Sequence, residues 1–170
     1  MIPSNPIIDT NVIARAADGD YECMRALEVL AEHKVPLMIP AVVYAELARG
    51  EQHGGVGRLP RGIVPAAFDF DVGLVLAKHF PTVAMKSLGT KSEREAWDFD
   101  AMIYATAIAH GADALITHNL DDFSRLTECA RDRGAIKVAL LHPRAIVAAA
   151  GPQAKAGEQT TLLGYFFPDG

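Results

Sequence analysis

Four short motifs in this chain place acidic or amide side chains beside apolar residues, and such side chains could hold a divalent cation. In chain order the motifs are Ile7-Ile8-Asp9-Thr10-Asn11, Tyr44-Ala45-Glu46-Leu47, Asp98-Phe99-Asp100-Ala101-Met102-Ile103 and Thr117-His118-Asn119-Leu120-Asp121-Asp122-Phe123. Oxygen atoms are the ligands that Mg²⁺ and Mn²⁺ prefer in proteins. A cation held in this way can promote the hydrolysis of phosphate esters, so phosphate chemistry is the first activity that the sequence indicates.

The motifs need strands and helices to bring them together. Apolar runs of strand length alternate with stretches of helical periodicity, which predicts an α/β fold with a short central, mainly parallel sheet flanked by helices. The strands are expected at residues 7–8, 37–39, 114–116 and 137–141. The helices are expected at residues 21–33, 41–49, 71–80, 99–110 and 123–133, with Gly111 and Gly134 after the last two.

This framework predicts where the acidic side chains meet. In open parallel sheets ligands bind beyond the carboxyl ends of the strands, and both Asp9 and the segment 117–119 directly follow predicted strands. Asp98 is placed to cap the helix 99–110, which puts Asp100 in its first turn, where the helix dipole favours an ionised carboxylate. Residues two apart on a helix point to different faces, so Asp100 is the better ligand of the pair. Glu46 would be presented by the helix 41–49.

Composition limits the class of protein. The chain has 170 residues, 50% of them hydrophobic, which is enough for one compact domain with its own core. Its formal net charge is −5, with 16 Lys and Arg against 21 Asp and Glu, so any nucleic acid must be held locally rather than by a general basic excess. Cys23 and Cys129 are too few and too far apart for a disulfide framework or a zinc knuckle, and we expect both to be buried bystanders in a reducing compartment.

The two ends of the chain and one internal segment carry further expectations. The first residues lack a basic region followed by a long apolar run, and no apolar stretch approaches the ~20 residues of a membrane span, so we expect a cytoplasmic protein without membrane association. Residues 1–150 are expected to form the domain, and residues 151–170 a C-terminal extension whose apolar part, 161–167, either contacts a partner or packs on its own domain. The glycine-rich segment 51–62 is expected to be a loop.

The order of the four motifs resembles that of the PIN-domain nucleases, and in particular the toxins of the VapBC toxin–antitoxin type. The resemblance covers roughly residues 5–148 and implies a PIN-like α/β/α sandwich. It implies that Asp9 and Asp100 are the main metal ligands and that Glu46 is the third carboxylate of the site. Thr10 and Asn11 would position Asp9.

The sequence leaves open which residue is the fourth member of the site. Asn119 and Asp122 both fall where the family often has a polar or acidic group, and this chain has Asn119 where many relatives carry Asp. We take Asn119 as the first candidate, with Asp122 and Thr117 as secondary ones. The sequence leaves open whether one or two cations are bound.

The resemblance also implies an activity and partners. The protein would be a Mg²⁺- or Mn²⁺-dependent endoribonuclease that acts as the toxin of a toxin–antitoxin pair, with RNA as substrate, a small antitoxin as inhibitor and a second copy of itself as partner. Lys86, Lys91 and Arg94 flank Asp100 in the sequence, and two arginines lie in the segment 51–62. These basic residues are either RNA contacts or a solvated loop.

Two other functions compete with this one. The first is a noncatalytic PIN scaffold that binds RNA or protein, which Asn119 would favour if it weakened the metal site. The second is a metal-dependent phosphatase of the haloacid dehalogenase type, suggested by the Asp-x-Asp pair Asp69 and Asp71. No convincing apolar strand precedes Asp69, and the pair is more typical of a helix start with Asp71 in the first turn.

Two further side chains have structural and functional interpretations. His118 lies beside Asn119, but no second histidine has ligand spacing and His142 is one of several scattered histidines, so we expect a surface or RNA-contact role for it. Trp97 precedes the helix 99–110 and is expected to be a hydrophobic staple, or else a surface on which a base stacks. Asp98 and Asp121 are expected to be caps or surface charges.

Overall fold

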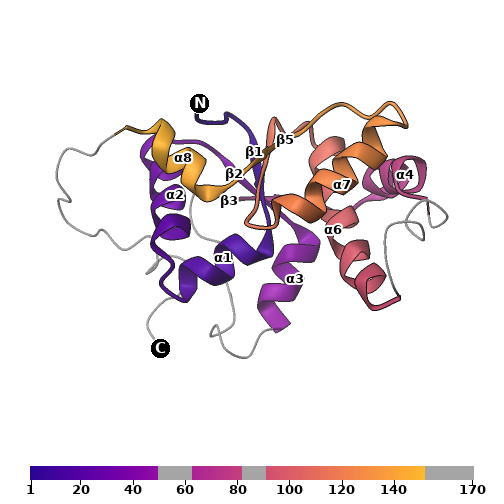
Figure 1. Cartoon of the computed structure of the whole chain (residues 1–170), viewed down its shortest axis with the longest axis horizontal. Coiled ribbons are helices and arrows are strands. Elements are labelled where there is room, and N and C mark those ends of the chain that lie inside the picture. Colours follow the sequence, from indigo (N-terminus) through magenta and orange to yellow (C-terminus); the bar gives the residue numbers. More distant parts are fainter. Residues whose placement is uncertain (50–62, 82–90, 152–170) are drawn as a thin grey trace.

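A five-stranded parallel sheet forms the centre of the molecule (Figure 1). The computed structural model describes residues 1–49, 63–81 and 91–151, and of residues 91–96 the backbone alone. The strands lie in the order β3-β2-β1-β4-β5 and all neighbours are parallel. Their bounds are Pro6–Ile8 for β1, Leu37–Pro40 for β2, Ile63–Ala66 for β3, Ala114–Ile116 for β4 and Ala139–Leu141 for β5.

Helices cover both faces of the sheet, so the predicted α/β/α sandwich is confirmed. In Figure 1, α2 and α8 lie on one side of the sheet, and α4, α6 and α7 lie on the other. The α3 helix contacts both α1 and α6. The helix bounds are Thr10–Ala17 for α1, Tyr21–Glu32 for α2, Ala41–Arg49 for α3, Phe70–His79 for α4, Lys91–Ala109 for α6, Leu120–Arg131 for α7 and Pro143–Ala149 for α8.

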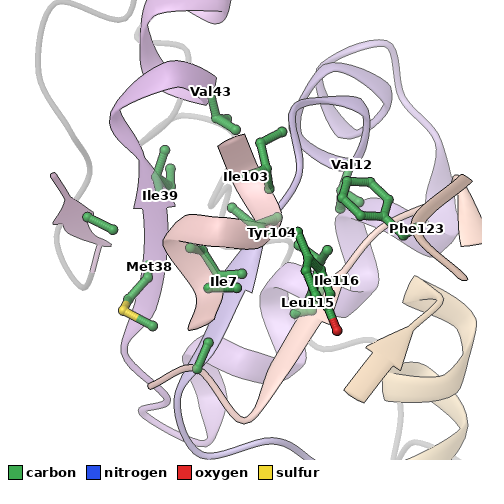
Figure 2. Packing of buried hydrophobic residues seen from close by; sticks show 14 of the residues in the cluster. Ile7, Val12, Met38, Ile39, Val43, Ile103, Tyr104, Leu115, Ile116 and Phe123 are labelled. Carbon is green, nitrogen blue, oxygen red and sulfur yellow. The ribbon is translucent and has the colours of Figure 1, made fainter. Parts of the chain in front are cut away.

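The central strands are short but completely enclosed. Every residue of β1, β2 and β4 is buried, and Figure 2 shows their side chains packed with those of α6. Ile7 is in register with Met38 on one side and with Leu115 on the other. This packing fixes the level at which β1 and β4 end, and therefore the positions of the residues that follow them.

Three short elements were not predicted from the sequence. The strand β3 contains Pro65, which cannot donate to a central ladder, but β3 lies at the edge of the sheet where a proline is tolerated. The helices α1 and α8 have only 8 and 7 residues, too few for a clear period. The predicted helix stops are confirmed, because Gly111 and Gly134 have φ of 65° and 74°, a conformation that glycine adopts without strain.

The start of α6 differs from the prediction. The helix begins at Lys91 rather than at Phe99, because residues 91–96 are mostly good helix formers. Asp98 is therefore exposed within the helix and caps nothing, and Asp100 is not in the first turn. Trp97 is buried with Arg125 against its ring, 5.6 Å from the ring centroid, so the staple and the base-stacking interpretations are both wrong.

Several predictions concern residues outside the described part of the chain. These are the loop at 51–62 with its arginines, Lys86, and the extension at 152–170. The side chains of Lys91 and Arg94 also lie outside it. Within the described part, no helix has the length and apolar character needed to cross a membrane.

Candidate functional site

Asp9 lies where β1 ends and α1 begins. Its backbone is extended at the N-cap position, yet its side chain does not cap the helix. Instead, Oδ2 accepts hydrogen bonds from Thr117 Oγ1, at 2.7 Å, and from Asn11 Nδ2. The side chain is only 4% exposed, and this burial raises the pKa of Asp9 to about 6, although the bond from Thr117 acts in the opposite direction. A buried carboxyl group held in one orientation is typical of a functional position.

Thr117 and its neighbours hold the end of β4 against the start of α1. The backbone amide of Asn119 donates to Thr117 Oγ1 at 2.9 Å, so this buried hydroxyl is fixed from both sides. The backbone amide of His118 donates to Asn11 Oδ1 at 3.1 Å. Asn11 therefore contacts Asp9 with its amide nitrogen and the β4 end with its amide oxygen. The prediction that Asp9 and the segment 117–119 converge is confirmed.

Glu46 and Asp100 approach Asp9 from two separate helices. Glu46 is exposed on α3, as predicted, and its Oε2 accepts a 2.7 Å hydrogen bond from Thr10 Oγ1. Asp100 is half-buried on α6. Its pKa is raised to about 7 by burial and then by the charges of Asp9, Asp122 and Glu46. Four carboxylates from four elements therefore face one another closely enough to repel. We call Asp9, Glu46, Asp100 and Asp122 the acidic pocket.

The fourth carboxylate comes from Asp122 rather than from position 119. Asp122 lies in the first turn of α7, and its charge raises the pKa of Asp100. Asn119 is the residue before this helix, and its side-chain amide donates to Asp122 Oδ2 at 2.7 Å. Asn119 thus holds the acidic side chain in place. Asp121 is exposed in the same turn, which agrees with the surface role expected for it.

The composition of the acidic pocket suits a hard divalent cation. All its donors are oxygen atoms, and a cation would offset the repulsion that raises the pKa of Asp9 and Asp100. Among the described residues, no three of these carboxylates have oxygen atoms that all lie within 4.8 Å of one another, and the triads that meet this limit are found around His118. A wider spacing suits Mg²⁺, which keeps several of its own water ligands.

The structure brings together two histidines that the sequence left apart. Nδ1 of His118 lies 3.1 Å from Nε2 of His142, although the two residues are 24 positions apart in the chain. Both are partly exposed, and the description of His142 as scattered is wrong because its ring contacts that of His118. The surface or RNA-contact role expected for His118 stays a prediction. No local motif could have shown this pair, because one residue follows β4 and the other caps α8.

The Asp-x-Asp pair on which the phosphatase alternative depends has a structural role. Asp69 is the N-cap of α4 and accepts a hydrogen bond from the backbone amide of Val72 at 3.1 Å. Asp71 follows in the first turn and is exposed. The predicted helix start is confirmed, and this pair needs no catalytic role to account for it.

Comparison with known proteins gives one family and a group of similar folds. The model of the family described as PIN domain matches residues 7–128. A search of curated proteins found no match. Among solved structures, VapBC2 from Rickettsia felis bound to a DNA fragment from their promoter is similar with a TM-score of 0.58 and 20% identity, over 84% of this chain and 98% of that one.

Two further solved structures show the same fold. DNA-bound VapBC from Salmonella typhimurium has a TM-score of 0.58 and 15% identity, over 84% of this chain and 99% of that one. FitAB bound to an IR36 DNA fragment has a TM-score of 0.51 and 20% identity, over 81% of this chain and 94% of that one. At these identities the likeness establishes a shared fold.

Proposed function

Because the chain belongs to the PIN domain family, we propose that it is a divalent-cation-dependent endoribonuclease that acts as the toxin of a toxin–antitoxin pair. The observation that carries this proposal is the meeting of four carboxylates at the carboxyl edge of a parallel sheet. Such an edge is where open α/β sheets bind ligands. An oxygen-only pocket at this place fits a cation that acts on phosphate.

In this proposal Asp9, Asp100 and Glu46 hold Mg²⁺ or Mn²⁺, and Asp122 replaces Asn119 as the fourth acidic group. The bound cation supplies a more acidic water and neutralises charge on the phosphate under attack. Asn119 positions Asp122, as its 2.7 Å hydrogen bond indicates. The assignment differs from the one expected from the sequence only in this exchange of roles.

The remaining polar residues orient the acidic groups. Thr117 and Asn11 both donate to Oδ2 of Asp9 and so fix the plane of that carboxylate. Thr10 donates to Glu46 and ties α3 to the start of α1. Partners of this kind keep ligands in position before the cation arrives, and their loss typically weakens metal binding ~10–100-fold.

The toxin role, the partners and the location are parts of the same proposal. The similar folds are those of complexes named VapBC and FitAB, and the chain covers nearly the whole length of each matched chain. This supports an antitoxin as the partner. We also propose RNA as substrate, a homodimer, a cytoplasmic location, and a nuclease domain at residues 1–150 followed by an extension at 151–170.

The first experiment is incubation of the purified protein with total cellular RNA in Mg²⁺, in Mn²⁺ and in chelator. Asp9→Asn and Asp100→Asn are the test variants, and Asp71→Asn is the matched control because Asp71 is exposed on α4. We expect discrete fragments that need the cation and that disappear in both test variants but not in the control. Sequencing of the fragment ends would then identify the target.

One outcome would remove the catalytic proposal. If all four proteins treat RNA alike, and calorimetry detects no binding of Mn²⁺ by the folded wild type, the acidic pocket is not a metal site. The noncatalytic scaffold would then take its place. Thermal unfolding of each variant, followed by circular dichroism, ensures that a lost activity is not a lost fold.

A further inference from the structure

A second group of chemically active side chains lies beside the acidic pocket, where the N-terminus of α2, the end of β4 and the start of α8 meet. Two overlapping triads, Asp20 with Cys23 and His118, and Glu22 with His118 and His142, each have ligand atoms within 4.8 Å of one another. The helices α2 and α8 lie side by side (Figure 1). We call these five residues the His118 cluster.

The ring of His118 has one nitrogen in use and one without a partner. Nδ1 is 3.1 Å from Nε2 of His142. Nε2 is buried and has no hydrogen-bond partner within the described part of the chain. Buried polar atoms are nearly always paired, so an unpaired one needs an explanation such as an ion that completes the site.

We propose that Asp20, Cys23 and His118 bind a Zn²⁺ ion, with Nε2 of His118 as its nitrogen ligand. One imidazole, one thiolate and one carboxylate form a set of three protein ligands that suits tetrahedral Zn²⁺ with water in the fourth position. The same donors are poor ligands for Mg²⁺, which prefers oxygen alone. This site is distinct from the acidic pocket in both its residues and its chemistry.

The first triad is preferred over the second because of how the ring nitrogens are used. In the second triad, His142 Nδ1 accepts from the backbone amide of Arg144 at 3.2 Å, and the other ring contacts join the two histidines. Glu22 is exposed and its Oε2 is 3.9 Å from His142 Nδ1. The buried thiol belongs to the first triad alone, and the nitrogen of His118 that lacks a partner is Nε2, not the Nδ1 that faces His142.

Asp20 can act as a ligand while it keeps its structural role. It is the N-cap of α2, and its Oδ1 accepts from the backbone amide of Cys23 at 3.0 Å. Arg15 lies 3.7 Å from Oδ2, with about half of its own side chain exposed, and can turn towards solvent. A carboxylate has about four acceptor positions, so a cap and a metal bond are compatible.

His142 and Glu22 complete the site as outer partners. Without metal, Arg144 donates to His142 Nδ1, so the proton of His142 is on Nε2 and that of His118 is on its own Nε2. When Zn²⁺ binds Nε2 of His118, the proton of each ring moves to its Nδ1 atom, so that His118 donates to His142 Nε2. The amide of Arg144 then gives up its bond to His142 Nδ1, whose proton faces Glu22. The thiol of Cys23 releases its proton to solvent, so protons and charge balance.

The metal would connect the His118 cluster to the acidic pocket through the backbone. His118 lies between Thr117 and Asn119, and its own amide donates to Asn11. An ion that ties His118 to α2 would therefore restrain the segment that holds Asp9 and Asp122. Its expected effect is structural stabilisation of the pocket.

The test is a Zn²⁺ titration of the full chain, purified without a polyhistidine tag, reduced and stripped of metal. It is made on the Asp9→Asn, Asp100→Asn double variant, so that binding in the acidic pocket does not contribute. We expect one equivalent of Zn²⁺ in competition with a chromophoric chelator. Co²⁺ in its place should give the absorption of a tetrahedral ion with a thiolate ligand.

Matched pairs of variants locate the site. Cys23→Ser should abolish the thiolate absorption and Cys129→Ser should leave it unchanged. Asp20→Asn should weaken binding while it keeps the cap, and Asp69→Asn, at the equivalent cap of α4, should not. Glu22→Gln should lower the affinity ~10–100-fold, as expected for an outer partner.

Two results would overturn the proposal. One is the absence of saturable Zn²⁺ binding in the folded double variant. The other is binding that Cys23→Ser and Asp20→Asn both leave unchanged, which would place the ion elsewhere. If Cys23→Ser does not fold, Asp20→Asn and His118→Gln answer the same question. Neither result depends on whether the protein cleaves RNA, so the two proposals fail separately.

Discussion

The acidic pocket and the His118 cluster share one short segment, residues 117–119, yet they differ in charge and in donor atoms. In the acidic pocket four carboxylates face one another, and repulsion adds to burial in raising the pKa of Asp100. In the His118 cluster the pKa of Asp20 is lowered, chiefly by the backbone amide of Cys23, with His118 and Arg15 contributing. Carboxylates therefore repel one another in the first region, whereas in the second the ionised form of Asp20 is stabilised by its neighbours.

The difference shows why one chain can hold two kinds of metal site. A region of repelling oxygen atoms gains most from a hard cation that neutralises it. A region with an unpaired nitrogen and a buried thiol offers softer donors, and an ion bound there must displace a thiol proton whose pKa is raised to about 12 by burial and by Asp20. The following predictions test whether the two regions are as separate as this comparison states.

The largest expected effect is the loss of the fourth carboxylate. Asp122→Ala should lower the rate of RNA cleavage at least ~100-fold, because it removes an acidic group from the metal site. Asn119→Ala should have a smaller effect, since it removes only the group that positions Asp122. Rates are measured on the RNA identified by fragment sequencing, with Asp121→Ala as the exposed control. The reverse order of effects would return position 119 to the site.

The next effect concerns the Thr117 hydroxyl, which contacts Asp9 after β1 and Asn119 after β4. Thr117→Val should weaken Mn²⁺ binding in the acidic pocket ~10–100-fold, because Asp9 loses an orienting donor and the amide of Asn119 loses its acceptor. Calorimetry with Mn²⁺ measures this change. Zn²⁺ binding by the His118 cluster should change much less. An equal loss at both sites would show that the regions are coupled through residues 117–119.

The third effect is a pH dependence of stability in the absence of metal. Asp9 and Asp100 have raised pKa values of about 6 and about 7, so the folded protein keeps protons that the unfolded chain loses near pH 4. Stability should therefore fall as the pH rises from 5 to 8, by on the order of 1–2 kcal/mol.

Denaturant unfolding in chelator measures this dependence. Asp100→Asn should flatten it, and Mg²⁺ should reduce it, because both relieve the repulsion within the acidic pocket. Stability that rises over the same pH range would show that the carboxylates do not repel as the structure indicates.

The smallest effect separates the two roles of Asp20. Asp20→Ala should cost ~1 kcal/mol of stability without metal, because the cap of α2 is lost, whereas Asp20→Asn should cost little since Asn also caps helices. Chemical denaturation in chelator compares the two variants. When Zn²⁺ is added, both should lose the stabilisation seen in the parent protein, which distinguishes the ligand role from the cap.

The sequence indicated the members of the acidic pocket through the order of its four motifs, since each member alone also has a plain structural interpretation. Asp9 follows an apolar strand, Glu46 lies on a helix between Pro40 and Gly50, and Asp100 precedes an apolar helical run. The exchange of roles proposed for Asn119 and Asp122 was not visible, because both residues fit the pattern. The structure distinguishes them by the charge of Asp122, which raises the pKa of Asp100, whereas Asn119 donates to Asp122.

The start of α6 shows the limit of local patterns in another way. The change of character at Phe99 suggested a helix start with Asp98 as cap, but the preceding residues also favour a helix and Trp97 packs into the core. Burial of one large side chain outweighed a plausible cap, because a cap contributes ~1 kcal/mol and burial of an aromatic side chain contributes more.

The sequence by itself determined the fold class and the order of the central elements, because strand and helix periods and the residues that end them are local properties of the chain. The order of its motifs also indicated the carboxylates of the proposed site. Only the tertiary structure decided that Asp122 completes the acidic pocket and that Asp20, Cys23, His118 and His142 meet. Asp20 and Cys23 lie together at the start of α2, but His118 follows β4 and His142 caps α8, at separations that carry no pattern. Their meeting depends on the register of the parallel strands and on the packing of α2 against α8, which are long-range consequences of burying one shared core.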